Sequence, residues 1–233
     1  MSPILIPTKS PEDWKRLLAQ PDLHWKRGYS AMTLARAWEA ARDNGLPPEV
    51  FNILQMGLPD AETLRLLVAI PEYKVALPGG STSSQTDVVA LVRGTTGLVA
   101  VAIEGKVDES LGPTVGQKRS EKSTGVDERL TYLLKELEVT NCSDEIRYQL
   151  LHRTVSALVI ADDFAATSAV MLVQSFSPSS KWLGDFQAFA RLFRTEAAPG
   201  RLLFVGKRHG IPLYIGWCAG DQKFREESIA PAV

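Results

Sequence analysis

The sequence predicts one α/β (α+β) domain, residues 1–233, in which helices flank a central mixed β-sheet. Two observations predict this fold class. Some segments repeat apolar residues at helical spacing, whereas others are short β-rich runs bounded by glycine or proline. Along the chain they follow the order helices, three strands, helices, strand, helix and two strands. Hydrophobic residues make up 45% of the chain, which suffices for a real core.

Residues 10–70 are predicted to form a helical N-terminal part. Ser30 is expected to cap a helix with apolar residues at helical spacing, which the glycine and prolines of residues 45–48 end. A short helix is expected near residues 49–55. A further helix is predicted over residues 60–69, because its leucines and valine fall on one side.

Residues 71–220 are predicted to form the sheet-containing core. A polar, basic loop is expected at residues 112–129. Helices are expected at residues 129–138, 144–162 and 183–193. The predicted strands are YKVAL (73–77), TDVVALV (86–92), LVAVAIE (98–104), SAVMLVQSF (168–176), RLLFVGK (201–207) and IPLYIGW (211–217).

Composition limits the function classes. The formal net charge of −1 gives no global basic field, so nucleic-acid binding would need a local basic face. Cys142 and Cys218 are expected to be separate buried thiols, which suits a reducing cytoplasm. The N-terminal residues do not resemble a signal peptide, and no stretch is long enough to span a membrane.

The stretch TDVVALVRGTTGLVAVAIEGK predicts a hairpin that turns at residues 94–97. With the two threonines as the loop, Asp87 lies opposite Glu104, and such pairs share one face of a sheet. Lys106 is two residues beyond Glu104 and therefore projects from that face. A second Glu-x-Lys, at residues 72–74, opens a strand instead of ending one and is interpreted as a chance copy.

Both faces of this hairpin are apolar along its length, so its strands are expected in the interior of the sheet. Two opposed carboxylates repel unless a cation lies between them, and Mg²⁺ prefers carboxylate and water oxygens. A metal ion held by Asp87 and Glu104 would polarise a phosphoryl oxygen and acidify a bound water. Lys106 would orient that water or stabilise developing charge.

An Asp followed by a strand that ends in Glu-x-Lys resembles the PD-(D/E)XK superfamily of restriction-endonuclease-like nucleases. The signature here is Thr86-Asp87 with Glu104-Gly105-Lys106, and threonine replaces the proline of the motif. The whole chain, through RYQLLHRTVSAL (147–158), also resembles an uncharacterised bacterial group with this core.

The resemblance implies the restriction-endonuclease-like fold, Mg²⁺ or Mn²⁺, and a nucleic-acid phosphodiester substrate, with DNA favoured over RNA. It leaves a homodimer open. It makes Asp87 and Glu104 the metal-binding acids and Lys106 the base. It adds the main-chain carbonyl of Gly105 and the helix acid Glu39 as further metal ligands.

Other polar residues have supporting roles in this hypothesis. Gln149 would orient water or metal, and His152 or Arg153 would contact phosphate. In the loop, the cations would neutralise phosphates, so that affinity falls as salt rises. These loop cations are Lys118, Arg119 and Lys122.

The alternatives remain open. Ordinary solvated polar surface is an alternative interpretation of the loop, the helix flank and Glu39, and the sequence favours it for Glu39 and for each helix residue taken singly. Asp87 and Lys106 would then form only a salt bridge worth at most about 1 kcal/mol. The function predicted is a metal-dependent nuclease. The alternatives are a non-catalytic member of the fold that binds nucleic acid or protein, and a scaffold in which the charges form only an ion cluster.

Overall fold

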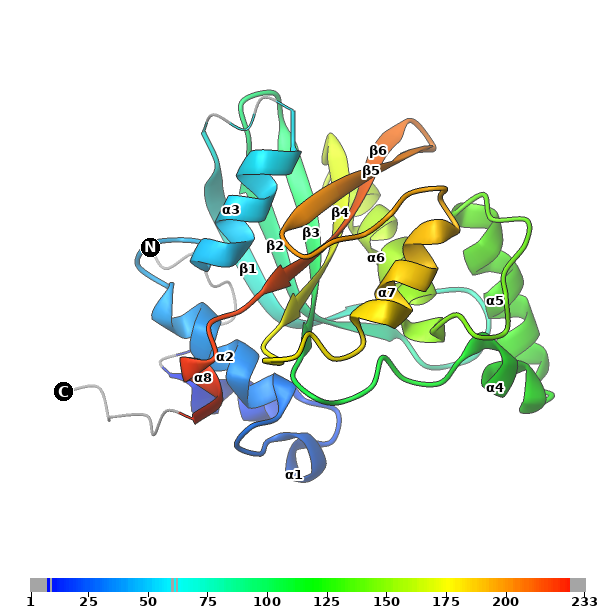
Figure 1. Ribbon diagram of the computed structural model, residues 1–233, viewed down its shortest axis with the longest axis horizontal. Coiled ribbons are helices and arrows are strands. Elements are labelled where there is room, and N and C mark those ends of the chain that lie inside the picture. The colour runs from blue at the N-terminus through cyan, green and yellow to red at the C-terminus, as the bar shows by residue number, and fades with distance from the viewer. Residues whose placement is uncertain (1–7, 9, 60, 62, 227–233) are drawn as a thin grey trace.

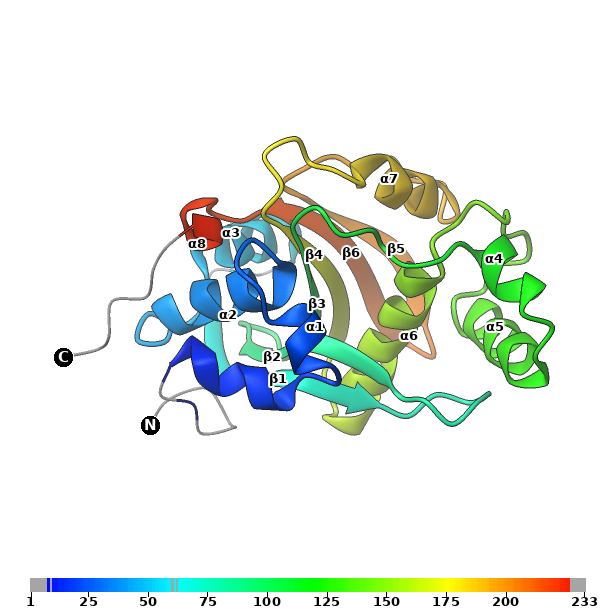
Figure 2. The ribbon, with the colours of Figure 1, turned by 90° about the horizontal axis from the view of Figure 1, so that it is seen from below.

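The computed structural model describes residues 8, 10–59, 61 and 63–226. It is a mixed α/β fold in which helices cover both faces of a six-stranded sheet (Figures 1 and 2). The helices are the 3-10 helix η1 (Pro11–Leu17), α1 (Pro21–His24), α2 (Ser30–Ala40), α3 (Pro48–Gly57), α4 (Val115–Ser120), α5 (Thr124–Glu136), α6 (Tyr148–Asp163), α7 (Leu183–Arg191) and α8 (Lys223–Glu226). The strands are β1 (Arg65–Val75), β2 (Ser84–Arg93), β3 (Leu98–Lys106), β4 (Ser168–Ser175), β5 (Arg201–Arg208) and β6 (Ile211–Ala219).

The strand order across the sheet is β1-β2-β3-β4-β6-β5. The pairs β1–β2, β2–β3 and β5–β6 are antiparallel, whereas β3–β4 and β4–β6 are parallel. The chain crosses from β3 to β4 through α4, α5 and α6, since parallel neighbours require a long connection. The expected mixed sheet is therefore confirmed, and β3 lies inside it.

Two hydrophobic clusters form the core, one on each face of the sheet. On one face, α2 and α3 pack over residues such as Val101 and Ile103 of β3. On the other, α6 packs over Ala100 and Ala102, the alternate residues of the same strand. Because β3 is apolar at both sets of positions, it is covered on both sides, as the sequence predicts.

The helices expected near residues 30–41 and 49–55 are confirmed as α2 and α3, and those expected at 129–138, 144–162 and 183–193 as α5, α6 and α7. The turn of the β2–β3 hairpin is also as expected, since Gly94 N–H donates to the Gly97 carbonyl. Within the described residues, no helix is both long and apolar enough to cross a bilayer.

Two predictions were wrong. The helix expected over residues 60–69 does not form in its described part, because Arg65 onward belongs to strand β1. The boundary between a helical part and the core therefore lies before residue 65, not at residue 70. The expected loop at 112–129 contains helix α4, which a capping box between Thr114 and Gln117 begins, and also the first residues of α5, which starts at Thr124.

Candidate active site

Three acids lie in a row across the strands β1, β2 and β3. Pairing of Val88 with Ile103 puts Asp87 at the next position opposite Glu104, in the register that the sequence predicts. On the other side, β1 residues 71 and 73 pair with β2 residues 88 and 86, so that Glu72 lies opposite Asp87. Directly opposed residues of a sheet share a face, and the three carboxylates therefore face the same side.

That side is the face covered by α6. Glu104 has the same strand parity as Ala100 and Ala102, which belong to the α6 cluster. Lys106 follows with the same parity. Gly105, between them, faces the α2 layer, where a Cβ atom would lie 3.0 Å from Leu34 Cδ2. The Glu-Gly-Lys end of β3 thus sends two charged side chains to one face and fits closely against a helix on the other.

The carboxylates line a cavity of about 250 Å³, here called the acid cavity. Its floor is formed by the three acids with Lys106, and α6 contributes one wall. The N-terminal segment contributes another wall and is joined to β2 by a hydrogen bond from Gln85 Nε2 to the Leu17 carbonyl. The lining residues are Leu18, Ala19, His24, Ser30, Ala31, Glu72, Gln85, Asp87, Glu104, Lys106, Gln149 and Arg153.

Glu104 is the centre of a buried ion-pair network. Its Oε1 accepts from Lys106 Nζ at 2.5 Å and from Gln149 Nε2 at 2.7 Å. Its Oε2 accepts from Arg153 Nε at 2.5 Å. Only 2% of Glu104 is exposed, and Lys106 and Arg153 are also buried. A buried carboxylate is tolerated because these donors satisfy it.

The network fixes the charge states at the end of β3. Burial raises the pKa of Glu104, but Arg153 and Lys106 outweigh it and hold that pKa at about 2. Burial lowers the pKa of Lys106, but Glu104 and Asp87 reverse this, so the pKa is raised. Glu104 is therefore an anion and Lys106 a cation near neutral pH. In this arrangement Lys106 donates a hydrogen bond to Glu104, and it does not fit the role of base that the resemblance implies.

The pKa values of the other two acids, Asp87 and Glu72, are shifted in the opposite direction to that of Glu104. Burial and the nearby Glu104 raise the pKa of Asp87 to about 7. Burial and the nearby Asp87 raise the pKa of Glu72 to about 8, against a hydrogen bond from Gln85 Nε2 to Glu72 Oε2. At pH 7 Glu72 is therefore mostly protonated and Asp87 about half protonated, because neighbouring negative charges in a poorly hydrated site disfavour the ionised forms.

The donor set fits a hard divalent cation. Carboxylate oxygens are the ligands that Mg²⁺ and Mn²⁺ prefer, and a cation would relieve the repulsion that raises the pKa values of Asp87 and Glu72. In the part of the chain that the structure describes, no three or more His, Cys, Asp or Glu side chains are grouped to hold a metal. Both oxygens of Glu104 already accept hydrogen bonds from Lys106 and Arg153.

Gln149 and Gly105 are both at the site, in the positions just described. Gly105 N–H donates to Asp87 Oδ2 at 2.9 Å, which holds this carboxylate against the end of β3. Gln149 of α6 lines the acid cavity beside Glu104. The structure thus brings the two strand acids, Lys106, Gly105 and Gln149 together.

Glu39 is not part of this site. It lies on α2, the helix that covers the other face of the sheet, and is not among the residues that line the acid cavity. Its Oε1 accepts from Thr8 and Trp14, and its Oε2 accepts from Arg42. The expectation that Glu39 supplies a metal ligand is therefore corrected: its carboxylate joins the N-terminal segment to α2.

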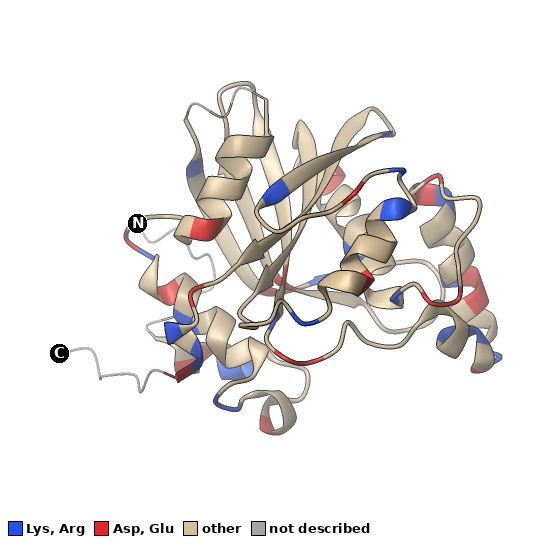
Figure 3. Ribbon diagram, viewed as in Figure 1, with Lys and Arg blue, Asp and Glu red and all other residues tan. Residues whose placement is uncertain are grey.

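The expected phosphate-binding cations are largely paired with acids. Lys118 Nζ lies 2.7 Å from Glu121, and Arg119 forms an ion pair with Asp144. Lys122 is exposed. Figure 3 shows basic and acidic residues together around α4 and α5. This surface therefore has no strong single-sign charge to attract a polyanion.

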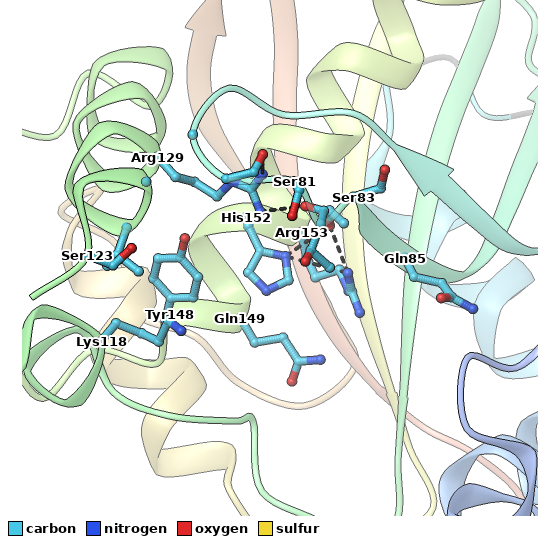
Figure 4. Close-up of a pocket in the computed structure, with 16 residues that line it drawn as sticks. Ser81, Ser83, Gln85, Lys118, Ser123, Arg129, Tyr148, Gln149, His152 and Arg153 are labelled. Atoms are coloured by element: carbon cyan, nitrogen blue, oxygen red, sulfur yellow. Dashed lines mark hydrogen bonds between the residues drawn. The ribbon is translucent and has the colours of Figure 1, made fainter. Parts of the chain in front are cut away.

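His152 and Arg153 line a second hollow, here called the polar pocket, of about 540 Å³. Figure 4 shows the side chains of Tyr148, Gln149 and His152 on α6 beside it, with Lys118 and Ser123 across from the loop that carries Ser81 and Ser83. Its lining residues are Gly79, Gly80, Ser81, Thr82, Ser83, Ser84, Gln85, Lys118, Ser123, Gly125, Val126, Arg129, Tyr148, Gln149, His152 and Arg153.

Glu72 is the site residue that the sequence interpretation missed. It belongs to the Glu-x-Lys at residues 72–74 that was set aside as a chance copy. Its position depends on the pairing of β1 with β2, in a segment partly mistaken for a helix. It also has a left-handed backbone, with φ of 53°, which is uncommon for a residue other than glycine and is found at functional sites.

Comparison with known proteins gives a family but no function. No curated protein and no solved structure matches the chain. A family model described as a domain of unknown function, DUF6946, matches residues 7–222, a span that includes every strand and the whole acid cavity. The chain therefore belongs to the DUF6946 family.

Proposed function

We propose that this protein is a metal-dependent nuclease that hydrolyses nucleic-acid phosphodiester bonds, with DNA favoured over RNA, on a restriction-endonuclease-like core. One observation carries the proposal. The acids Glu72, Asp87 and Glu104 lie side by side on three adjacent strands, next to the buried ammonium of Lys106 and open to a cavity. Acids beside a fixed cation suit chemistry in which negative charge develops on phosphoryl oxygens.

The chain's own residues have distinct roles in this hypothesis. Asp87 and Glu72 are the oxygen donors that would hold Mg²⁺ or Mn²⁺, with Glu104 beside them. Bound there, the ion would supply Lewis-acid polarisation of the phosphoryl group and a more acidic water. Lys106 keeps its proton and orients the phosphate or stabilises its developing charge. Gln149 positions Glu104 and offers its amide to water or phosphate.

The hydrogen bonds of Glu104 favour one alternative function. Both of its oxygens are bound by Lys106, Gln149 and Arg153. A carboxylate that is neutralised in this way can serve structure alone. The protein would then be a non-catalytic member of the fold that binds nucleic acid or another protein.

Cleavage of a labelled oligonucleotide with and without Mg²⁺ or Mn²⁺ tests the proposal. Asp87→Asn removes a charge and keeps the shape of the side chain. We expect cleavage by the wild type only with metal, and a loss of about a hundredfold or more in Asp87→Asn. Glu39→Gln is the matched control, because its carboxylate lies on the other face of the sheet, and it should cleave at nearly the wild-type rate.

Two results would contradict the proposal. One is metal-dependent cleavage that survives in a folded Asp87→Asn variant. The other is the absence of cleavage on single-stranded and double-stranded DNA and RNA with either metal. In the second case, retained nucleic-acid binding would support the non-catalytic alternative.

A further inference from the structure

The polar pocket adjoins the acid cavity. Gln85 of β2 and Gln149 and Arg153 of α6 line both hollows and form the partition between them. At about 540 Å³, the polar pocket lies within the range of about 300–1,000 Å³ that is usual for small-ligand sites. A ligand bound in the polar pocket would therefore lie next to a group bound in the acid cavity.

The charge of the two hollows differs. Lys118, Arg129 and Arg153 line the polar pocket, and none of its described lining residues is acidic. Lys118 pairs with Glu121 and Arg153 with Glu104, so Arg129 is the cation through which the pocket attracts a ligand. Arg129 donates through Nε and both Nη atoms to backbone carbonyls, including those of Leu77 and Pro78. Its positive charge is thus held beside the pocket by neutral acceptors. This arrangement favours a ligand with a negatively charged part.

The remaining lining groups are neutral and form hydrogen bonds. Burial and the nearby Arg153 lower the pKa of His152 well below its usual range, so that its ring is uncharged. Arg153 Nη1 donates to Ser84 Oγ, which leaves the serine hydrogen for His152 Nδ1, 2.9 Å away. The proton of His152 is then on Nε2, and this edge of the ring acts as a donor.

Aromatic and hydroxyl groups complete the lining. The rings of Tyr148 and His152 lie 5.4 Å apart, centroid to centroid, on one side of the pocket. Hydroxyl groups come from residues 81–84 and Ser123, and amide groups from Gln85 and Gln149 (Figure 4). Planar rings with a mixed set of neutral donors and acceptors suit a heterocyclic base and a sugar.

We propose that the polar pocket binds one unpaired nucleotide of the nucleic acid whose neighbouring phosphodiester occupies the acid cavity. This inference rests on the proposed function and narrows its substrate to strands with an unpaired nucleotide next to the bond cleaved. The pocket is bounded by residues 79–83 of the β1–β2 loop, the start of β2, α4, α5 and α6. A base stacked and paired inside a duplex cannot enter such a hollow without leaving the stack.

Titration calorimetry of the full chain in EDTA tests the pocket without catalysis. The probes are the ribonucleoside and deoxyribonucleoside 5′-monophosphates of each base, the free nucleosides, and inorganic phosphate. We expect at least one mononucleotide to bind tenfold or more tightly than its nucleoside and than phosphate. Equal affinities for phosphate and every mononucleotide would overturn the proposal, because only an anion would then be recognised.

Two variants block the pocket from different sides. Ser83→Trp acts from the β1–β2 loop, and Ser123→Trp acts from the start of α5, where the serine makes no capping hydrogen bond. Both positions are exposed, so circular dichroism should show folded proteins. Each is expected to weaken mononucleotide binding at least tenfold. Ser179→Trp, at an exposed position of the β4–α7 loop, is the matched control and should bind like the wild type.

The same proteins separate this proposal from the nuclease. Wild-type affinity in both folded blocking variants would overturn the nucleotide pocket, even if Mg²⁺-dependent cleavage is observed. Mononucleotide binding that the blocking variants remove would support the pocket, even if no cleavage is found. With cleavage established, faster cleavage of unpaired strands than of blunt duplex should disappear in Ser83→Trp. An equal rate on both substrates in the wild type would contradict the proposal.

Discussion

Arg153 Nε donates to Glu104 Oε2 at 2.5 Å, and both side chains are buried, with 7% and 2% of their surfaces exposed. The guanidinium also donates through Nη1 to Ser84 Oγ. One arginine of α6 therefore joins the ends of β2 and β3 beneath both cavities. Such a pair stabilises the fold only while both charged partners are present, because either one alone would be a buried ion without a counter-charge.

Removing that cation should destabilise the fold strongly. We expect Arg153→Met to lower the free energy of unfolding by about 3–5 kcal/mol, because Glu104 loses its largest favourable partner. Urea denaturation followed by circular dichroism measures this. Adding Glu104→Gln to Arg153→Met should recover part of the loss. Lys118→Met breaks the partly exposed Lys118–Glu121 pair instead and should cost no more than about 1 kcal/mol.

Glu72 should contribute to metal affinity. We expect Glu72→Gln to weaken Mn²⁺ binding by about ten- to hundredfold, because it removes one of the three carboxylates of the row. Calorimetric titration measures the affinity, with Glu39→Gln as the control that should leave it unchanged. Equal Mn²⁺ affinity in Glu72→Gln and the wild type would exclude Glu72 as a ligand.

Metal binding should release protons. Burial and neighbouring acids raise the pKa values of Asp87 and Glu72 to about 7 and about 8, so at pH 7 Asp87 is about half protonated and Glu72 mostly protonated. A cation must displace these protons, so affinity should rise with pH and level off only above the pKa of Glu72, at about pH 9. Titrations in two buffers with different ionisation enthalpies give the number released. A number near zero at pH 7 would contradict the expected protonation.

Without metal, the raised pKa of Asp87 should lower the free energy of unfolding as pH rises. At most carboxylate sites the pKa is depressed on folding, and stability rises with pH instead. A carboxyl group whose pKa is raised on folding makes its full contribution to the stability of the folded protein below its unfolded pKa. That contribution is lost as pH rises through the pKa of the folded state. For Asp87, that window lies between about pH 4 and pH 7. Asp87→Asn should therefore gain melting temperature relative to the wild type as pH rises from about 5 to about 8 in EDTA. A constant difference would count against the raised pKa.

Arg129 should hold the loop that closes the polar pocket. It donates to the carbonyls of Leu77, Pro78 and Thr82, and Gly79 packs so tightly on α5 that a Cβ would lie 2.4 Å from Arg129 N. We expect Arg129→Gln to increase hydrogen exchange of amides 79–83 by about tenfold or more. Lys135→Gln, at an exposed position on the same helix, is the control and should leave this exchange unchanged.

The elements predicted correctly are those whose own residues decide their structure. Strand β3 is apolar at every position up to Glu104, and α2 has apolar residues at helical spacing, so local pattern and tertiary environment agree. Strand β1 is different. Its leucines and valines also satisfy a helical spacing, and Pro71 interrupts the strand pattern. Its pairing with β2, which the local sequence does not encode, makes it a strand.

The part of the site that the β2–β3 hairpin determines could be predicted from the sequence. The turn at residues 94–97 sets the register that brings Asp87 opposite Glu104. The contribution of Glu72 depends on the register of β1, which shifts at an irregularity between Leu66 and Val68. The partners of Glu104 on α6 depend on how that helix crosses the sheet. Neither can be obtained from residue spacing alone.

The wall of the acid cavity formed by residues 18–31 has a practical consequence for protein engineering. A truncated expression fragment that starts at residue 71 would cut strand β1 in two and delete that wall together with α2. The apolar surface of β2 and β3 beneath α2, including Val88 and Ile103, would then be in contact with water. Such a fragment should aggregate, and a useful shortened version must keep the segment from η1 onward.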